Sequence, residues 1–298
     1  MAGISGVAAL GGFSLWAAIN QNLRKVTILH TNDTHSRLDP FPPGDPDYPG
    51  MGGYARRAAF ISQVRRNDPE ILLLDAGDIF QGTPYFNMFG GVPELKLMSL
   101  MGYDAATMGN HELDNGLQGF SKVLPYAQFP FVSSNYDFSH TILHEKIMRY
   151  LVLRRNGIKI GIYGLGINLS GLVSPALFEG TFYLDPVEVA RDTETILKNR
   201  FNCDLIICLS HLGYQYNHQQ ISDLKLSGET SFTDIVIGGH THTILDTPVV
   251  VNNARNHPVT IVQTGYGGVR IGMIDVVFDK NTGEKFVDFN TKKIGKNQ

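Results

Sequence analysis

The stretch "YDAATMGNHELDNG", residues 103–116, changes character at its midpoint. Its first six residues are mostly apolar or small, and they predict a buried strand. The next eight are polar, charged or glycine, with the single exception of Leu113. The turn contains an amide, an imidazole and two carboxylates: Asn110, His111, Glu112 and Asp114. Either this turn is a surface loop with solvent-exposed polar side chains, or these groups converge on a common ligand.

Four other apolar runs end in a similar way, at residues 25–30, 71–76, 205–210 and 233–237. Taken singly, an Asp, Asn or His after a strand is ordinary turn or surface chemistry. Five such turns in one chain are hard to explain in this way, because turns do not need histidine. The candidate residues of the five turns are Asp33, His35, Asp78, Asn110, His111, Asp114, His211, His240 and His242.

These side chains supply imidazole, carboxylate and amide donors but no thiolate. That donor set suits divalent Zn, Mn, Fe or Co. The number of donors exceeds the needs of one tetrahedral site. It fits two ions roughly 3.5–4 Å apart, which activate a water molecule and clamp a transferring phosphoryl group. The sequence therefore predicts a dinuclear metal site.

Outside these turns, apolar runs alternate with helix-period segments. Predicted helices lie within residues 52–66, 92–102, 117–127 and 185–201, and the third is expected to end near Pro125. The last of them has Asp185 as its N-cap. Asn156-Gly157 joins two alternating runs and predicts a hairpin. Further antiparallel strands are predicted at residues 248–253, 258–265 and 268–279. This order predicts a layered α/β fold with mixed sheets and helices outside, in which sites lie at the carboxyl ends of strands.

The composition of the 298-residue chain is that of an ordinary globular protein, with 43% hydrophobic and 18% charged residues. The formal net charge of −3 gives no reason to expect a basic face that binds nucleic acid. Cys203 and Cys208 lie in one predicted strand at an odd spacing, so their side chains point to opposite faces. We therefore expect no disulfide between them.

The first 22 residues are apolar and rich in small side chains, as in the hydrophobic and cleavage regions of a secretory signal. They lack the basic segment that precedes those regions in a complete signal. One interpretation is the remnant of a signal peptide, which predicts a periplasmic or otherwise exported protein. The other is a short N-terminal arm packed on the domain, which leaves a cytoplasmic location open. The segment is too short and glycine-rich to predict a membrane span.

Five segments carry a family resemblance: "ILHTNDTHSRLDP", "DAGDIFQGTPY", "GNHELDNG", "SHLGY" and "GGHTH". They occur in this order between Ile28 and His242, and together they resemble the calcineurin-like metallophosphoesterases. They are most similar to the N-terminal catalytic domain of the secreted 5′-nucleotidase family. The resemblance implies a four-layer α-β-β-α sandwich of two mixed sheets flanked by helices, over residues 23–298. It also implies a 5′-nucleotidase-type phosphomonoesterase that uses a metal-bridging hydroxide.

The resemblance assigns the ligands as two sets with a shared member. Asp33, His35 and His242 would hold one metal ion. Asn110, His211 and His240 would hold the other. Asp78 would bridge both, because a carboxylate between two dications offsets their repulsion and sets their spacing.

His111 follows the ligand Asn110 directly and cannot easily reach the same ion, so it is left for the substrate. It would stabilise the phosphoryl oxygens or protonate the leaving alkoxide. Asn110 would also contact the substrate. Asp114 would accept the other ring N–H of His111 and keep the imidazole oriented and charged. The alternative role for Asp114 is a turn cap, and Glu112 is interpreted as a supporting or structural residue.

The chain departs from the bifunctional 5′-nucleotidases at its end. In those enzymes a C-terminal domain supplies the aromatic pair that stacks the base, whereas this chain ends at Gln298, about where the catalytic domain ends. The nucleoside pocket is therefore expected on a separate C-terminal nucleotidase-domain subunit, or the phosphate ester is not a nucleotide. Two alternatives remain open: a phosphodiesterase, for instance on 2′,3′-cyclic nucleotides, and a non-catalytic partner subunit.

Aromatic residues in two predicted loops, residues 39–53 and 81–91, offer a hydrophobic docking surface for such a partner. The alternative is that these side chains fold onto their own domain. They are Tyr48, Tyr85, Phe86 and Phe89.

Overall fold

The computed structural model describes residues 22–295, and its first sheet is built around the parallel strands β1 to β4. These strands read as nearly continuous apolar runs because both faces of the sheet are covered. β13 lies antiparallel to β1 on one side and to β14 on the other. In sheet order the strands are β14 (Lys285–Lys293), β13 (Arg270–Asp279), β1 (Leu23–Thr31), β2 (Leu72–Asp75), β3 (Ala105–Thr107) and β4 (Phe131–Val132).

The second sheet also has a parallel centre, formed by β12, β10, β9 and β7. Antiparallel strands β11 and β6 form its two edges. In sheet order the strands are β11 (Val249–Asn252), β12 (Pro258–Val262), β10 (Ile235–Gly238), β9 (Leu205–His211), β7 (Ile158–Gly166) and β6 (Tyr150–Arg155). A small pair, β5 (Tyr136–Asp137) and β8 (Phe182–Tyr183), lies apart from both sheets.

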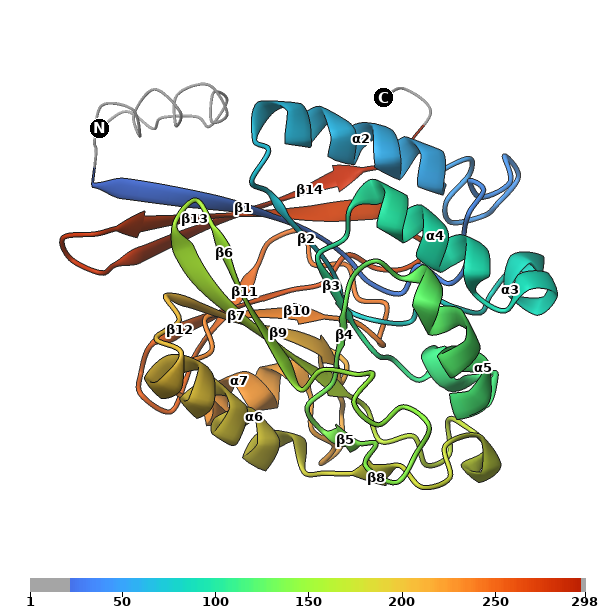
Figure 1. Ribbon diagram of the computed structural model, residues 1–298. Coiled ribbons are helices and arrows are strands. Elements are labelled where there is room, and N and C mark those ends of the chain that lie inside the picture. Colours follow the sequence, from blue (N-terminus) through green and yellow to red (C-terminus); the bar gives the residue numbers. More distant parts are fainter. Residues whose placement is uncertain (1–21, 296–298) are drawn as a thin grey trace.

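The two sheets pack face to face, and helices cover both outer faces (Figure 1). Ile28 and Leu74 of the first sheet share one buried core with Ile207 and Ile237 of the second. A separate core joins the first sheet to α2 (Tyr54–Asn67), α4 (Val92–Met101) and α5 (Gly116–Val123). A third core joins the second sheet to α6 (Pro186–Thr195) and α7 (Asp223–Glu229). The fold is therefore the expected four-layer α-β-β-α sandwich.

Local signals in the sequence mark several elements correctly. Asn156 and Gly157 both have a positive φ, 48° and 74°, and join β6 to β7 in the predicted hairpin. Asp185 caps α6, since its carboxylate accepts hydrogen bonds from the N–H groups of Val187 and Glu188. Cys203 and Cys208 are both buried and form no disulfide, as predicted. The predicted placement is wrong, however, because Cys203 precedes β9 and both cysteines belong to the core between the second sheet and its helices.

The predicted end of the third helix near Pro125 is confirmed, since α5 ends at Val123 and is followed by the 3₁₀ turn Leu124–Tyr126. Other elements differ from the sequence prediction. β12 pairs in parallel with β10, so the prediction of antiparallel tail strands is wrong for that pair. Elements without a predicted counterpart include the helices α3 (Pro84–Phe89) and α7 and the strands β5, β8 and β14. The two helices have six and seven residues, too few for a helical period to stand out.

The two interpretations of residues 1–22 concern a segment that lies, except for Asn22, outside the described residues. Within residues 22–295, no helix combines the length and the apolar character that crossing a membrane requires.

Candidate metal centre

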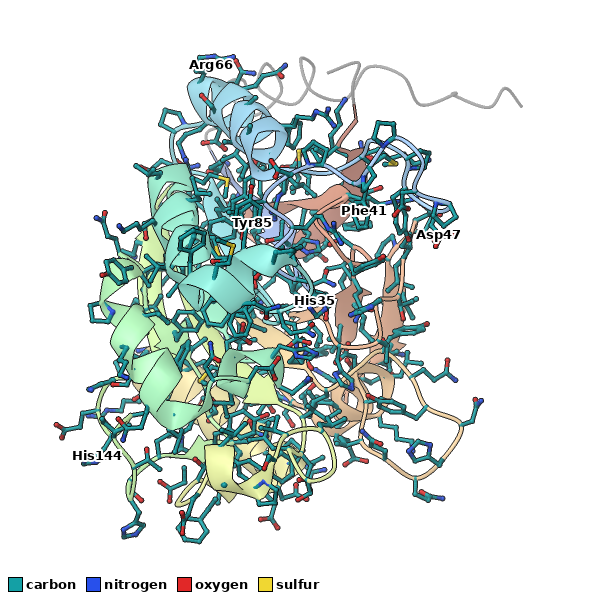
Figure 2. All side chains as sticks on the ribbon, turned by 90° about the vertical axis from the view of Figure 1, so that its right-hand side faces the viewer. His35, Phe41, Asp47, Arg66, Tyr85 and His144 are labelled. Carbon is teal, nitrogen blue, oxygen red and sulfur yellow. The ribbon has the colours of Figure 1, made fainter. Side chains whose placement is uncertain are left out.

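The seven predicted metal ligands lie in five loops that meet at one end of the two sheets. β1, β2 and β3 run parallel in the first sheet, and β9 and β10 run parallel in the second, so each set presents its carboxyl ends on one side. In Figure 2, His35 lies near the middle of the face on view. The chain thus brings together residues that are as many as 209 positions apart, Asp33 and His242.

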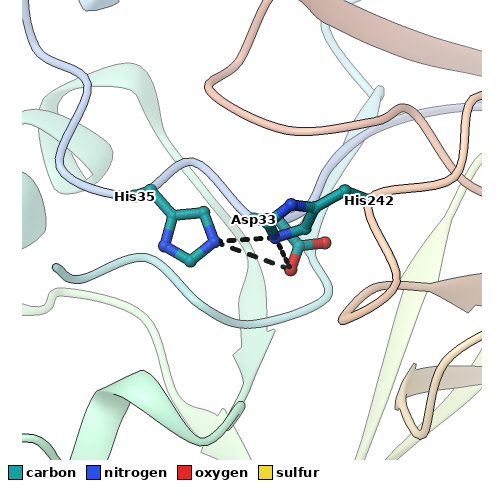
Figure 3. A group of neighbouring side chains, drawn as sticks. All are labelled: Asp33, His35 and His242. Atoms are coloured by element: carbon teal, nitrogen blue, oxygen red, sulfur yellow. Dashed lines mark hydrogen bonds and ion pairs between the residues drawn. The ribbon is translucent and has the colours of Figure 1, made fainter. Parts of the chain in front are cut away.

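The first group of side chains consists of Asp33, His35 and His242, whose potential ligand atoms all lie within 4.8 Å of one another. The Nε2 atoms of His35 and His242 are 3.0 Å apart (Figure 3). Oδ1 of Asp33 lies 3.4 Å from Nε2 of His242 and 3.9 Å from Nε2 of His35. Asp33 and His35 are buried, and His242 is the member of the group most open to solvent.

The second group consists of Asp78, His211 and His240, again with ligand atoms within 4.8 Å of one another. Nε2 of His211 is 2.9 Å from Oδ2 of Asp78. Oδ1 of Asn110 is 3.0 Å from Nδ1 of His240, so the amide oxygen lies beside this second group. Asp78 also forms a third group with His35 and His111. It therefore lies between the two sets of donors.

Two of the imidazoles in these groups, His35 and His211, have Nδ1 against a backbone carbonyl and Nε2 directed at the other donors. Nδ1 of His211 lies 2.7 Å from the carbonyl oxygen of Ala76, and a carbonyl only accepts, so Nδ1 carries the proton. Nε2 of His211 then points at the Asp78 carboxylate, yet it makes no hydrogen bond of acceptable geometry there. In His35, Nδ1 likewise faces the carbonyl of Phe80 at 3.2 Å. Such ring nitrogens fit the coordination of a cation.

The backbone of the ligand loops is held in an unusual conformation. Five of the seven candidate ligands have a positive φ between 47° and 71°: Asp33, His35, Asp78, His240 and His242. Side chains other than glycine rarely adopt this left-handed region, and each instance costs roughly 1–3 kcal/mol unless the surroundings over-determine it. Here hydrogen bonds between the loops hold this conformation, for example the bond from the N–H of Asp33 to the carbonyl of Gly77 at 2.9 Å. Strain concentrated in this way is typical of a functional site.

Glycines allow these loops to approach one another closely. A Cβ atom on Gly239 would lie 2.7 Å from Nδ1 of His211, and one on Gly109 would clash with the Asp78 carboxylate. Any larger side chain at either position would push a candidate ligand away. The glycines beside the polar residues in the sequence therefore make room for the donors.

Buried charges in the centre depend strongly on each other. Burial alone would raise the pKa of Asp78, but His211, and then His35 and His111, hold that pKa well below its usual range. Burial alone would lower the pKa of His211, but the Asp78 carboxylate raises it to about 10, so a metal ion bound at Nε2 would displace a proton from the ring. Asp78 is therefore ionised at neutral pH, which is the state that a metal ligand requires.

His111 and Asp114 form a contact beside the metal ligands. Nδ1 of His111 lies 2.7 Å from Oδ2 of Asp114, and the backbone N–H of His111 donates to Oδ1 of Asp78. Burial opposes protonation of His111, but the Asp114 hydrogen bond and the Asp78 charge raise its pKa to about 8. The Asp114 side chain thus contacts the imidazole, as expected for an orienting role.

Glu112 connects two of the ligand loops, which the sequence alone did not reveal. Its buried carboxylate accepts hydrogen bonds from the backbone N–H groups of Asp78 at 3.0 Å, Ile79 at 2.8 Å and Gly109 at 2.6 Å. It therefore holds the loop after β2 against the loop after β3. The only sequence signal was a second carboxylate in a turn already rich in polar groups.

We expect Glu112→Gln to weaken metal binding roughly 10–100-fold, as is typical when a residue that supports metal ligands is lost. The amide keeps one oxygen acceptor, but its NH₂ group cannot accept from the remaining N–H donors. Isothermal titration with Mn²⁺ would measure the change. The exposed residue Glu145 provides a matched control, and Glu145→Gln should leave the affinity unchanged. Equal affinities for the Glu112 variant and the unmodified chain would contradict this supporting role.

Like Glu112, Tyr266 lies at the metal centre although the sequence pattern does not indicate it. Its ring stacks on His242, with centroids 5.0 Å apart and an interplanar angle of 13°. Tyr266 lies in the turn after β12. The backbone N–H of the next residue, Gly267, donates to the carbonyl of Asp33 at 2.7 Å. This turn follows a parallel strand like the other five, but it carries no side chain typical of a metal ligand. A sixth strand-end turn was the available signal.

The four aromatic residues considered for a docking surface fall into two classes. Phe86 is buried and stacks on Phe80, and the ring of Tyr48 packs against Tyr266. Both thus fold onto their own domain. Phe89 is 49% exposed, and the half-buried Tyr85 donates its hydroxyl to Asp39.

Known proteins with similar sequences include several nucleotide phosphoesterases. The chain is 34% identical over 278 residues to a snake venom 5′-nucleotidase from Gloydius brevicauda. It is 32% identical over 287 residues to the trifunctional nucleotide phosphoesterase protein YfkN of Bacillus subtilis. Each alignment covers 86% of this chain, but only 45% of the first protein and 18% of the second. The chain therefore spans less than half the length of either relative.

Structural and family comparisons agree with these relatives. The crystal structure of a 5′-nucleotidase precursor from Thermus thermophilus matches with a TM-score of 0.82 and 32% identity. That match covers 91% of this chain and 55% of the Thermus chain. The family model of the calcineurin-like phosphoesterases matches residues 26–243, which include every candidate ligand. The chain therefore belongs to the calcineurin-like phosphoesterase family, whose members are metal-dependent phosphoric ester hydrolases.

Proposed function

We propose that this chain is a dimetal-dependent phosphomonoesterase of the 5′-nucleotidase type, with its catalytic domain in residues 23–298. The observation that carries the proposal is the position of Asp78 between two groups of histidine and carboxylate donors. Two ions held in this way would supply an activated water and clamp the phosphoryl oxygens. The complete set of donors argues against a non-catalytic partner subunit, since a protein without catalysis has no need to keep all of them.

The ligands divide between the two ions according to their contacts. Asp33, His35 and His242 would hold one ion. Asn110, His211 and His240 would hold the other, and Asp78 would bridge the two. The metals that suit this donor set are Zn, Mn, Fe or Co in the divalent state.

His111 would act on the substrate rather than on the metals, with Asn110 contacting the same phosphate. The imidazolium would stabilise the phosphoryl oxygens or donate its Nε2 proton to the leaving oxygen. Asp114 would hold Nδ1 and favour the charged ring, since the two side chains are 2.7 Å apart. This contact supports a role in orientation, with the turn cap as the alternative.

We further propose that the substrate is a nucleotide, that the protein is exported, and that a separate subunit of the C-terminal nucleotidase type supplies selectivity for the base. The names of the relatives support the substrate class. The similar Thermus protein is a 5′-nucleotidase precursor, which supports export.

The function is tested by the turnover of p-nitrophenyl phosphate and bis(p-nitrophenyl) phosphate with and without Mn²⁺. We expect hydrolysis of the monoester that a chelator abolishes and added Mn²⁺ restores. A clear preference for the bis ester would favour the phosphodiesterase alternative instead. Failure to hydrolyse either ester in the presence of Mn²⁺, Zn²⁺, Co²⁺ and Fe²⁺ in turn would contradict an enzymatic role.

A further inference from the structure

His242 differs from His35 and His211 in how its ring is held. Nδ1 of His35 and Nδ1 of His211 each face a backbone carbonyl oxygen, at 3.2 Å and 2.7 Å. Among residues 22–295, Nδ1 of His242 has no hydrogen-bond partner, while its Nε2 faces the other donors of the first group (Figure 3). A histidine that binds a metal usually donates its second ring N–H to a carbonyl or a carboxylate, which fixes the orientation of the ring. His242 lacks this support, and its side chain is 41% exposed.

A neighbouring aromatic ring supplies the missing restraint. A histidine does not fix its own ring plane, because rotation about the Cβ–Cγ bond has broad minima. Tyr266 stacks on His242 with centroids 5.0 Å apart and an interplanar angle of 13°. Nearly parallel, offset rings at this separation attract each other, and turning the imidazole out of this plane would break the contact. The stack thus limits the directions in which Nε2 of His242 can point.

The turn that carries Tyr266 is fastened to both ligand loops of the first group. The backbone N–H of Gly267 donates to the carbonyl of Asp33 at 2.7 Å. The backbone N–H of Gly265 donates at 2.9 Å to the carbonyl of Thr243, the residue that follows the ligand histidine. Both glycines have a positive φ, 80° and 66°, which such a tight turn requires. The position of Tyr266 is therefore coupled to the loops that it supports.

Two aromatic side chains from the loop at residues 39–53 hold the Tyr266 ring in place. The centroid of Phe41 lies 5.7 Å from that of Tyr266, and the centroid of Tyr48 lies 5.6 Å from it. Phe41 is only 3% exposed, and the guanidinium of Arg37 covers its ring at 4.2 Å. Tyr266 is thus locked by its surroundings before any ion binds, which is what a residue that orients a ligand requires.

We propose that Tyr266 is a positioning residue of the first metal group, and that its stacked ring orients His242 in place of a hydrogen bond. The inference rests on His242 being a metal ligand, as in the proposed function. It also makes the two ions differ in their support. His211 of the second group is fully buried and held by a carbonyl, whereas His242 depends on an aromatic stack. Loss of the Tyr266 ring should therefore weaken the binding of one ion only.

Tyr266→Ala tests the proposal by removing the ring. Isothermal titration of the full chain with Mn²⁺ would measure the affinity of each ion. We expect the affinity for one of the two ions to fall roughly 10–100-fold, as is typical when support for a metal ligand is lost, and the affinity for the other to stay unchanged. Tyr266→Phe keeps the ring and removes only the hydroxyl, so it should bind both ions as the unmodified chain does.

Tyr126→Ala is the matched control. Tyr126 is 41% exposed and lies against Lys96, with Nζ 4.8 Å from the ring centroid, so this change removes a tyrosine ring that belongs to none of the donor groups. Its Mn²⁺ binding should not change. Thermal unfolding of each variant in the presence of a chelator checks the fold. If Tyr266→Ala does not fold, Tyr266→Leu keeps an apolar side chain that cannot stack, and the same loss of one ion is expected.

A double-mutant cycle with His242→Ala shows whether Tyr266 acts through the imidazole. If it does, Tyr266→Ala should cause no further loss of Mn²⁺ affinity in a chain that already lacks His242, because the ring that it orients is gone. A further loss as large as that in the single variant would show that Tyr266 acts elsewhere, and would overturn the assignment.

The remaining outcomes separate this inference from the proposed function. If the unmodified chain binds two Mn²⁺ ions and Tyr266→Ala binds both equally well, the role of Tyr266 is wrong and the proposed function stands. Equal losses in Tyr266→Phe and Tyr266→Ala would also overturn the role, because the hydroxyl and not the stack would then act. Loss of both ions would indicate a general contribution to the fold instead. If the unmodified chain binds no second ion with any of the four metals, the dinuclear centre is wrong, and this inference fails with it.

Discussion

Asp78→Ala is expected to abolish metal-dependent hydrolysis and to lower the metal content to at most one ion per chain. Among the described residues, Asp78 shares one donor group with His35 and another with His211 and His240, and it is 2% exposed. Its removal takes away the shared negative charge that offsets repulsion between two dications. The backbone N–H of His111 also loses the acceptor that it has at 2.9 Å.

Metal analysis together with steady-state turnover of p-nitrophenyl phosphate checks this expectation. Asp246→Ala is a suitable control, because Asp246 is an exposed carboxylate that pairs with Arg270 and belongs to none of the donor groups. A pair of exposed charges contributes little to stability, so the control should retain its metals and its turnover. Two ions per chain and near-normal turnover in Asp78→Ala would show that Asp78 does not bridge.

His111→Ala is expected to retain both metal ions and to lose about 10²–10⁴-fold in kcat, the usual contribution of a positioned acid or base. The loss should be smaller for p-nitrophenyl phosphate than for an alkyl phosphate, because nitrophenolate leaves without a proton. An equal loss on both substrates would instead indicate stabilisation of the phosphoryl oxygens. Loss of a metal ion would make His111 a ligand and rule out either role.

Asp114→Asn complements that variant through the pH dependence of the rate. A carboxylate beside an imidazole favours the charged ring, and Asp114 is among the groups that raise the pKa of His111 to about 8. If the protonated ring is the active form, activity is present below its pKa and is lost as the pH rises through it. Removing the Asp114 charge lowers that pKa, so the alkaline limb of kcat/KM should move to lower pH. A limb that does not move would favour a turn cap.

The sequence is sufficient to predict the identity of the donors and the class of fold. Apolar runs that alternate with helix-period segments indicate a layered α/β fold, and this depends only on local periodicity. The Asp, Asn and His residues at the ends of five strands indicate a metal centre, because parallel strands share the side on which their carboxyl ends lie. The hairpin at Asn156-Gly157 and the helix cap at Asp185 were also predictable, since a turn and a helix cap are determined by a few adjacent residues.

The tertiary structure decides which of these groups meet and what surrounds them. Nothing local in the sequence places His242 3.0 Å from His35, because that contact joins loops 207 residues apart through the packing of two sheets. The three N–H groups on Glu112 and the ring of Tyr266 on His242 have the same origin. Each is an interaction between segments that approach only when the cores form. Residue type and spacing predict which chemistry is available, whereas distances between separate loops depend on long-range packing that no local pattern encodes.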